Sequence, residues 1–194
     1  MAHTRAALLH ATDACVARYG VRKTTMVDVA SRSGVAKATL YNHFRTKDDV
    51  LTALVEQRVT ELVATALAAD GLQAALEKVA HTIATSAALR KVAAEEPAVL
   101  APLLRAGDGR GWGIARDGVA AVLSAAQLPA GPQQVELVLR WCTSQLMWPA
   151  PVDGAAALLE GLGSAPARVP PPSQVPPAAE PADGVGWPVP APRS

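Results

Sequence analysis

The sequence predicts an all-α fold, with a small N-terminal helical domain at residues 1–47 and a larger helical domain at residues 48–163. Apolar residues recur at intervals of three and four along most of the chain, as they do on the buried face of an amphipathic helix. Two threonines, Thr25 and Thr46, each have an aspartate three residues later, a pairing that caps the start of a helix. Every segment with periodic apolar residues is therefore predicted to be helical.

The first helix is predicted to end at Gly20, which the basic pair Arg22-Lys23 follows. Its apolar stripe is expected to pack under the next two helices. The stripe consists of Leu8, Thr12, Cys15, Val16 and Tyr19.

Two short helices are predicted to meet at a tight turn around Gly34. The first begins near Met26, directly after the threonine cap, and Gly34 supplies the left-handed conformation in which helices often stop. The second buries Leu40 and Phe44, which lie four residues apart on one face. Ala36 precedes this helix and cannot cap it through its side chain. Two short helices around a tight turn form a helix-turn-helix.

The outward face of the second short helix carries hydrogen-bonding side chains. A helix of this size fits the major groove of DNA, where each base pair displays its own pattern of donors and acceptors. We expect the DNA-contacting residues to be Thr25, Lys37, Ala38, Thr39, Tyr41, Asn42, His43 and Lys47. Lys47 lies at the start of the next helix, where free backbone amides and its ammonium group together form an anion site suited to a phosphate.

The distribution of charge along the chain agrees with DNA binding at this end. Residues 1–47 contain eight Lys and Arg against two Asp and Glu, a net charge of +6, and the remainder of the chain carries −5. A local excess of positive charge favours the salt-sensitive part of DNA binding, which comes from the release of condensed counterions. Ordinary solvated surface charge is the alternative, but the excess coincides with the motif.

The run Thr39-Leu40-Tyr41-Asn42-His43-Phe44, followed by Lys47, resembles the DNA-binding domain of the TetR family of one-component transcriptional regulators. The resemblance covers roughly Ala6 to Leu54, and beyond it only helix lengths and order are similar. It implies that Tyr41 and His43 meet base edges and phosphates and that Lys47 binds a phosphate. It further implies a homodimer on a palindromic operator, most often a repressor, which a small-molecule effector releases from DNA.

The later helices are predicted from their apolar stripes. One long helix follows Thr46 for several turns and connects the first domain to the second. A helix from Leu72 to Ala94 leaves His81 on its outer side. Its buried stripe is Leu76, Val79, Ile83 and Ala87. A glycine-rich connection then precedes a helix that starts near Trp112, and these glycines lack the Lys-Ser/Thr ending and the preceding strand of a phosphate-binding loop.

The segment Gln133–Trp148 has apolar residues on two separate faces. One face carries Val135, Val138, Leu139, Cys142 and Leu146. The other carries Leu137, Trp141 and Trp148. We expect the first face to pack in the core and the second to form a dimer interface, because aromatic residues such as Trp are enriched in interface cores. A central helix covered on both sides within one chain is the alternative.

The effector pocket that the resemblance implies is expected near Trp112, Trp141 and Met147. Ligand pockets are lined mostly by apolar side chains with a few polar anchors, which suits these residues. Simple core packing is the alternative for each of them.

Residues 164–194 are predicted to be a disordered, polyproline-like tail, because ten of the chain's sixteen prolines lie between Pro166 and Pro192. Recognition of this tail by domains that bind Pro-rich segments is an alternative. A short alanine-rich helix at residues 153–162 is predicted to precede the tail.

Cysteines, histidines and hydropathy limit the other possibilities. Cys15 and Cys142 lie on apolar stripes far apart in the chain, which predicts free thiols in a reducing cytoplasm, with a redox-sensing thiol as the alternative. The four histidines show no close pairing, so we expect no metal and no cofactor. No apolar run is long enough to span a membrane, and we expect a cytoplasmic protein.

Two other functional classes compete with the regulator. A constitutive or architectural DNA-binding protein would have the same motif but no effector, and the small second domain favours this class. An enzyme is not expected, because the sequence has no nucleophile beside a base, no paired inward carboxylates at helical spacing and no cofactor loop.

Overall fold

The computed structural model describes residues 2–104, 109–147, 155 and 158–160, and every secondary-structure element in these ranges is helical, which confirms the predicted class. The predicted tail, most of the predicted helix 153–162 and Trp148 lie outside the described residues. The helices are α1 (Ala2–Lys23), α2 (Met26–Ser33), α3 (Lys37–His43), α4 (Lys47–Leu67), α5 (Gly71–Thr85), α6 (Ala87–Glu95), α7 (Pro97–Leu104), α8 (Arg110–Ala125) and α9 (Pro132–Met147).

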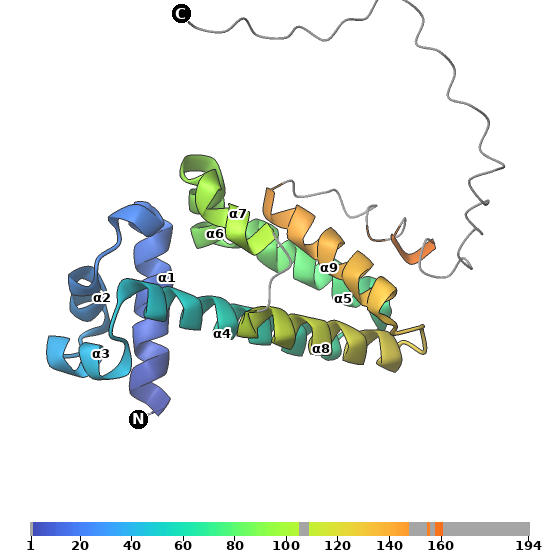
Figure 1. The fold of residues 1–194 in the computed structure, drawn as a ribbon, viewed down its shortest axis with the longest axis horizontal. Coiled ribbons are helices and arrows are strands. Elements are labelled where there is room, and N and C mark those ends of the chain that lie inside the picture. Colours follow the sequence, from blue (N-terminus) through green and yellow to red (C-terminus); the bar gives the residue numbers. More distant parts are fainter. Residues whose placement is uncertain (1, 105–108, 148–154, 156–157, 161–194) are drawn as a thin grey trace, which may run out of the picture. The chain divides into compact units, whose positions relative to one another are not determined.

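The N-terminal helices enclose a core of their own. Helices α1, α2 and α3 and the first turns of α4 surround it (Figure 1). Leu8, Leu9, Leu40 and Val50 are completely buried in it, and Val29 and Cys15 are 1% exposed. Burying an aliphatic side chain of this size stabilises a fold by about 1.5–3 kcal/mol, so this core holds the short helices together.

Both predicted threonine caps form. The hydroxyl of Thr25 accepts a hydrogen bond from the backbone N–H of Asp28 at 3.2 Å, and the Asp28 carboxylate accepts one from the backbone N–H of Thr25 at 2.9 Å. Thr46 and Asp49 repeat this arrangement at the start of α4, at 3.1 and 2.9 Å. Gly34 ends α2 in the left-handed region with a φ of 67°, as predicted.

The predicted stripe of α1 is confirmed except at Tyr19. Its buried members are Leu8, Thr12, Cys15 and Val16. Tyr19 is instead 38% exposed, and the guanidinium carbon of Arg18 lies 5.2 Å from its ring centroid. The residue that continues the buried row one turn after Val16 is Gly20, where the helix is interrupted by a φ of 81°. The predicted stripe therefore ended on Tyr19, whereas the buried row ends on Gly20.

The single helix predicted over residues 72–94 is wrong, because α5 and α6 are two helices that meet at Ser86. The backbone of Ser86 is extended, with a ψ of 115°, and its hydroxyl accepts a hydrogen bond from the backbone N–H of Leu89 at 3.3 Å. Serine is a favoured helix N-cap, so the residue type at this position indicates a new helix start that the apolar spacing concealed.

The break at Ser86 also corrects the predicted buried stripe. Leu76, Val79 and Ile83 are buried, whereas Ala87 is exposed because it lies beyond the break. His81 is exposed, as predicted.

Helix α7 is an element that the sequence analysis did not predict. It begins at Pro97, and proline suits the first position of a helix because its missing N–H would have no partner there. The predicted glycine-rich connection lies partly outside the described residues. Helix α8 has Gly109 at its N-cap and begins at Arg110, two residues before the predicted start near Trp112.

A second core lies among α5, α8 and α9, and α4 runs along α8 (Figure 1). Leu123 of α8 is completely buried in it, together with Leu76 of α5 and Val138 of α9. The long helix α4 therefore extends from the first core to the second.

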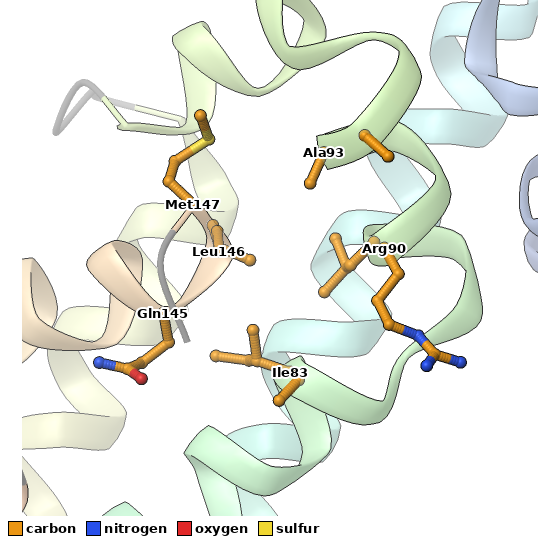
Figure 2. A pocket seen from close by; sticks show the side chains of 9 residues that line it. Ile83, Arg90, Ala93, Gln145, Leu146 and Met147 are labelled. Atoms are coloured by element: carbon orange, nitrogen blue, oxygen red, sulfur yellow. The ribbon is translucent and has the colours of Figure 1, made fainter. Parts of the chain in front are cut away.

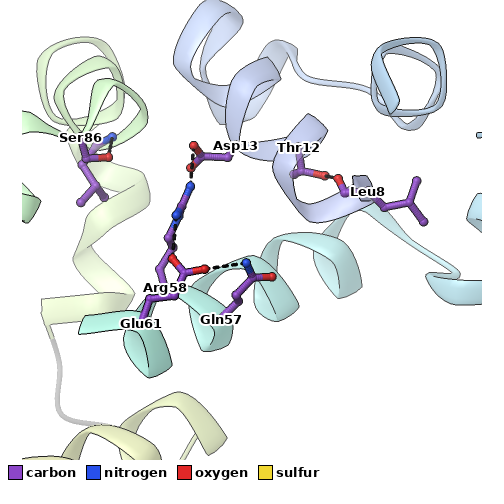
Figure 3. A network of polar contacts seen from close by, with 8 residues as sticks. Leu8, Thr12, Asp13, Gln57, Arg58, Glu61 and Ser86 are labelled. Carbon is purple, nitrogen blue, oxygen red and sulfur yellow. Dashed lines mark hydrogen bonds and ion pairs between the residues drawn. The ribbon is translucent and has the colours of Figure 1, made fainter. Parts of the chain in front are cut away.

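A polar network ties α1 to the middle of α4 (Figure 3). The guanidinium of Arg58 lies 2.8 Å from the carboxylate of Asp13 and 2.7 Å from that of Glu61, which also accepts a hydrogen bond from Gln57. Partial burial acts to raise the pKa of Glu61, but the hydrogen bonds from Gln57 and Arg58 outweigh it and lower the pKa. Exposed ion pairs contribute only about 0–1 kcal/mol, so this network orients α4 more than it stabilises the fold.

Helices α4 and α8 approach each other closely at Gly118. A Cβ atom at this position would lie 2.3 Å from Cγ2 and 2.6 Å from Cγ1 of Val63. A side chain fits there only if Val63 or one of the helices shifts, so glycine allows the two helices to lie this close.

We expect Gly118→Ala to lower the free energy of unfolding by about 1–3 kcal/mol, the usual range for an overpacked core, measured by urea denaturation. Gly113→Ala in the same helix is the matched control, because nothing lies within 4 Å of a Cβ atom there. That control should raise the stability by about 0.5–1 kcal/mol, since alanine is the better helix former. Equal effects of the two substitutions would contradict the close approach.

Candidate nucleic-acid interface

Helix α3 has one buried face and one open face. Leu40 is completely buried and Phe44, directly after the helix, is 6% exposed, so the helix cannot rotate without exposing both. Tyr41, one residue after Leu40, is 42% exposed. Of the other predicted contacts on this helix, the exposed ones are Lys37, Ala38 and Asn42, and the half-buried ones are Thr39 and His43. The structure therefore brings the predicted residues of α3 to one accessible surface.

Two cation–π contacts lie at α3, one within the helix and one from α1. Ala36 provides no side-chain cap for α3, as predicted. The ammonium of Lys37 lies 6.0 Å from the ring centroid of Tyr41, and the guanidinium carbon of Arg5 lies 5.6 Å from that of Phe44. Arg5 was not among the predicted site residues, and nothing in the helical pattern distinguishes it from other basic residues on α1. Its charge nevertheless lies beside α3.

Thr25 differs from the other predicted contacts because its hydroxyl is already engaged. It donates a hydrogen bond to the Asp28 carboxylate at 2.6 Å and accepts one from the backbone N–H of Asp28 at 3.2 Å. The side chain therefore holds the start of α2. A contact to DNA through this hydroxyl would have to replace the bond to Asp28.

The ammonium of Lys47 is folded onto the end of α1. It donates hydrogen bonds to the backbone carbonyls of Val21 at 3.1 Å and Arg22 at 3.3 Å. Two of its three protons are used in this way, and one is left for another acceptor. Its charge stays at the start of α4, where the helix dipole favours an anion.

Residues 8–54 match the family described as bacterial regulatory proteins, tetR family. The matched stretch runs from α1 through α2 and α3 into α4, the same helices that enclose the N-terminal core. Residues 8–54 are therefore a DNA-binding segment of the TetR family. Members of this family are DNA-binding transcriptional regulators and are generally not enzymes. The predicted family is confirmed.

Several solved structures, a TetR family repressor among them, share the fold. The TetR family repressor AlkX from Dietzia sp. strain DQ12-45-1b is 18% identical, with a TM-score of 0.64 over 81% of this chain and 91% of that chain. GusR of Salmonella enterica is 19% identical, with a TM-score of 0.51 over 82% and 91% of the two chains. A transcriptional regulator from Rhodococcus sp. Rha1 is 22% identical, with a TM-score of 0.53 over 84% and 99%. A comparison with curated proteins finds no match.

Metal-binding clusters and membrane-spanning helices are not found in the described ranges. Within them, no three His, Cys, Asp or Glu side chains are grouped so that they could hold a metal ion. No helix in the same ranges is both long enough and apolar enough to cross a membrane.

A hollow of about 290 Å³ lies between α5, α6 and α9. Leu146 and Met147 of α9 face Ile83 and Ala93 across it (Figure 2). The stem of Arg90 contributes to the wall, but its guanidinium points away from the hollow. The hollow therefore suits an apolar molecule better than an ionic one.

The three predicted pocket residues lie at two different places in the structure. Met147 lines the hollow, whereas Trp112 and Trp141 pack against the core among α5, α8 and α9. The prediction relied on apolar character, which core residues and pocket residues share.

The two predicted faces of α9 differ in burial. On the first face, Val135, Val138 and Leu139 are buried. On the second face, Leu137 is 43% exposed and Trp141 is half-buried, while Trp148 is outside the described residues. Of the two described residues on the predicted interface face, Leu137 is the more accessible to a partner.

Both cysteines are free thiols in apolar surroundings. Cys15 is buried in the N-terminal core, and burial raises the pKa of its thiol. Cys142 packs against the second core, and burial raises its pKa to about 12. Because the thiolate is the reactive form, neither residue has the low pKa that a redox-sensing thiol needs.

We expect both thiols to resist iodoacetamide in the folded protein at about pH 8, because burial raises the pKa of Cys15 and raises that of Cys142 to about 12, which keeps the thiols protonated. In urea both should be alkylated, because unfolding returns the pKa to its ordinary value. Intact mass spectrometry counts the added groups. Rapid modification of the folded chain at either cysteine would instead support a redox-sensing thiol.

Proposed function

We propose that this protein is a sequence-specific transcriptional regulator that reads its operator with α3. The observation that carries the proposal is the fixed orientation of this helix, in which Leu40 and Phe44 are buried and Tyr41 is open. The helix belongs to a segment, residues 1–47, with a net charge of +6. A fixed polar face supports direct readout of base edges, and the charge supports general affinity for the phosphate backbone.

The DNA contacts follow from this orientation. Base edges and nearby phosphates are contacted by Thr25, Lys37, Ala38, Thr39, Tyr41, Asn42 and His43. Lys47 holds a phosphate with the proton that its two carbonyl partners leave unused. Tyr41 is central because it is the large exposed side chain of α3 and has the Lys37 ammonium 6.0 Å from its ring centroid.

The protein binds a palindromic operator as a homodimer. Two copies of α3 then enter successive major grooves, about 34–36 Å apart. The copies pair through α9, and the exposure of Leu137 beside the half-buried Trp141 supports this face. Apolar residues left open next to an aromatic side chain are typical of interfaces between subunits.

We infer that the protein is a repressor in the cytoplasm and that a small apolar molecule releases it from DNA. The aliphatic hollow between α5, α6 and α9 supports such a ligand. A ligand releases DNA only if it binds the low-affinity conformation more tightly than the DNA-bound one. AlkX, which shares the fold, is a repressor.

A constitutive DNA-binding protein is the second candidate. The observation in its favour is the size of the hollow, about 290 Å³, which is just below the usual range for ligand pockets of about 300–1,000 Å³. A thermal-shift screen of metabolites separates the two candidates. An effector raises the melting temperature by binding the folded state, whereas a screen without any stabilising compound supports the constitutive protein.

Selection of duplexes from a random pool by the purified protein tests the function. The expected result is an enriched inverted repeat whose half-sites lie about one helical turn apart. If no duplex is preferred over random competitor at modest ionic strength, the proposed function fails.

Tyr41→Ala should weaken binding to the selected duplex by about 1–3 kcal/mol, measured by fluorescence anisotropy, because alanine cannot reach the base or phosphate that the tyrosine binds. Tyr41→Phe removes the hydroxyl and keeps the ring, so it shows how much of the lost affinity is due to the hydroxyl. Tyr19→Ala is the matched control, since Tyr19 is 38% exposed, similar to the 42% of Tyr41, but lies on α1. Equal decreases in affinity for both alanine substitutions would remove Tyr41 from the site.

Leu137→Glu should shift the protein from dimer to monomer, because it places a charge in the proposed apolar interface. Light scattering over a range of protein concentrations measures the change in mass. Thr82→Glu adds the same charge at an exposed position on α5 and should leave the mass unchanged. A dimer that tolerates Leu137→Glu would place the interface on another face.

A further inference from the structure

Glu96 follows the last residue of α6 and is buried, with 9% of its surface exposed. Its carboxylate accepts hydrogen bonds from the backbone N–H groups of Val21 at 2.8 Å and Arg22 at 3.2 Å. The partners are 75 and 74 residues apart in the sequence. A carboxylate at the end of α6 thus binds the backbone at the end of α1, within the helix-turn-helix domain.

The two N–H groups meet at one carboxylate because α1 is interrupted at Gly20. A φ of 81° at this residue lies in the region that favours glycine, and it turns the next amides out of the helical hydrogen-bonding pattern. Successive N–H groups turned in this way form a concave site for an anion. A Cβ atom at Gly20 would lie 2.8 Å from Oε1 of Glu96, so glycine also makes room for the carboxylate.

The same two residues are held from the other side by Lys47. Its ammonium binds the carbonyls of Val21 at 3.1 Å and Arg22 at 3.3 Å. In this turn, Val21–Arg22, the N–H groups are thus bound by Glu96 and the C=O groups by Lys47 at the start of α4. With both sets engaged, the peptide groups of the turn are held in one orientation.

An apolar cluster lies beside this contact, because Val21 belongs to both. Val16, Ala88, Val92 and Leu100 form a buried cluster of α1, α6 and α7, and Val21 and Leu51 pack against it. A hydrogen bond is stronger in such surroundings than in water, and a buried carboxylate without partners is costly. Glu96 therefore has a strong preference for the bound arrangement.

We propose that Glu96 is a positioning residue for DNA binding: it holds the Val21–Arg22 turn, and the turn holds the Lys47 ammonium where a DNA phosphate is bound. The proposal rests on the proposed function, in which Lys47 contacts a phosphate. Without the carboxylate the turn is free to move, and the long Lys47 side chain must be ordered when DNA binds. That ordering opposes binding, because it removes side-chain entropy.

A double-mutant cycle on the full chain tests the proposal, with the duplex selected by the unmodified protein as the probe. In the unmodified background, Lys47→Ala should lower the slope of log affinity against log salt by about 1, because one phosphate is no longer neutralised. Beside Glu96→Ala, Lys47→Ala should lower the log affinity by less than half as much as in the unmodified background, because the cost of ordering the Lys47 side chain has already weakened its contact. Residues that act together depart from additivity, so the effect of Lys47→Ala becomes smaller once Glu96 is replaced. A general loss of folding would instead leave the effect of Lys47→Ala on the folded molecules unchanged.

Two further variants sharpen the cycle. Glu96→Gln keeps one carbonyl acceptor and should give an intermediate affinity, and it replaces Glu96→Ala in the cycle if that variant does not fold. Glu95→Gln is the matched control, because the neighbouring Glu95 is exposed and pairs with Lys91, so the affinity should be unchanged. The proposal is overturned if Lys47→Ala has the same effect in the Glu96→Ala or Glu96→Gln background as in the unmodified protein.

Hydrogen exchange separates a failure of this inference from a failure of the proposed function. The amides of Val21 and Arg22 should exchange faster in Glu96→Ala than in the unmodified chain, and at an unchanged rate in Glu95→Gln. If the unmodified protein selects no duplex, the proposed function fails whatever the exchange rates. If it binds DNA but these amides exchange equally fast in all three proteins, the inference fails by itself.

Discussion

At seven residues, α3 is too short to be stable through its own backbone hydrogen bonds, since isolated helices need roughly 12–15 residues. It also lacks a side-chain cap at Ala36. It is held because Leu40 and Phe44 are buried in the core that α1, α2 and α4 enclose. The open face of α3 is therefore a product of tertiary packing, and any change that loosens the N-terminal core also changes how this face is presented.

Two physical connections join this domain to the later helices. The first is α4, which contributes Val50 and Leu54 to the N-terminal core and meets α8 where Val63 contacts Gly118. The second is the Glu96 carboxylate at the end of α6, the helix that also lines the aliphatic hollow. One connection is a close-packed helix pair and the other is a small polar contact within an apolar cluster. Both join the N-terminal domain to the later helices by direct contact.

Much of the helical architecture follows from local signals. The caps at Thr25 and Thr46 form within three residues of sequence, so residue type and spacing suffice to predict them. The outward face of α3 follows from the spacing of Leu40 and Phe44. Prediction failed where two local signals disagreed: continuous apolar spacing concealed the new helix start at Ser86, because periodicity describes a face and not the continuity of the backbone.

The sequence by itself determined the fold class, the helix-turn-helix and its polar face, because these depend on residues close together in the chain. Only the tertiary structure decided the partners of Glu96, Lys47 and Gly118. Their contacts join helices that are distant in sequence, and an apolar or polar position does not specify which helix will cover it. For the same reason Trp141 was a candidate for both pocket and interface by sequence, and its place against the second core emerged only when α9 was packed on its neighbours.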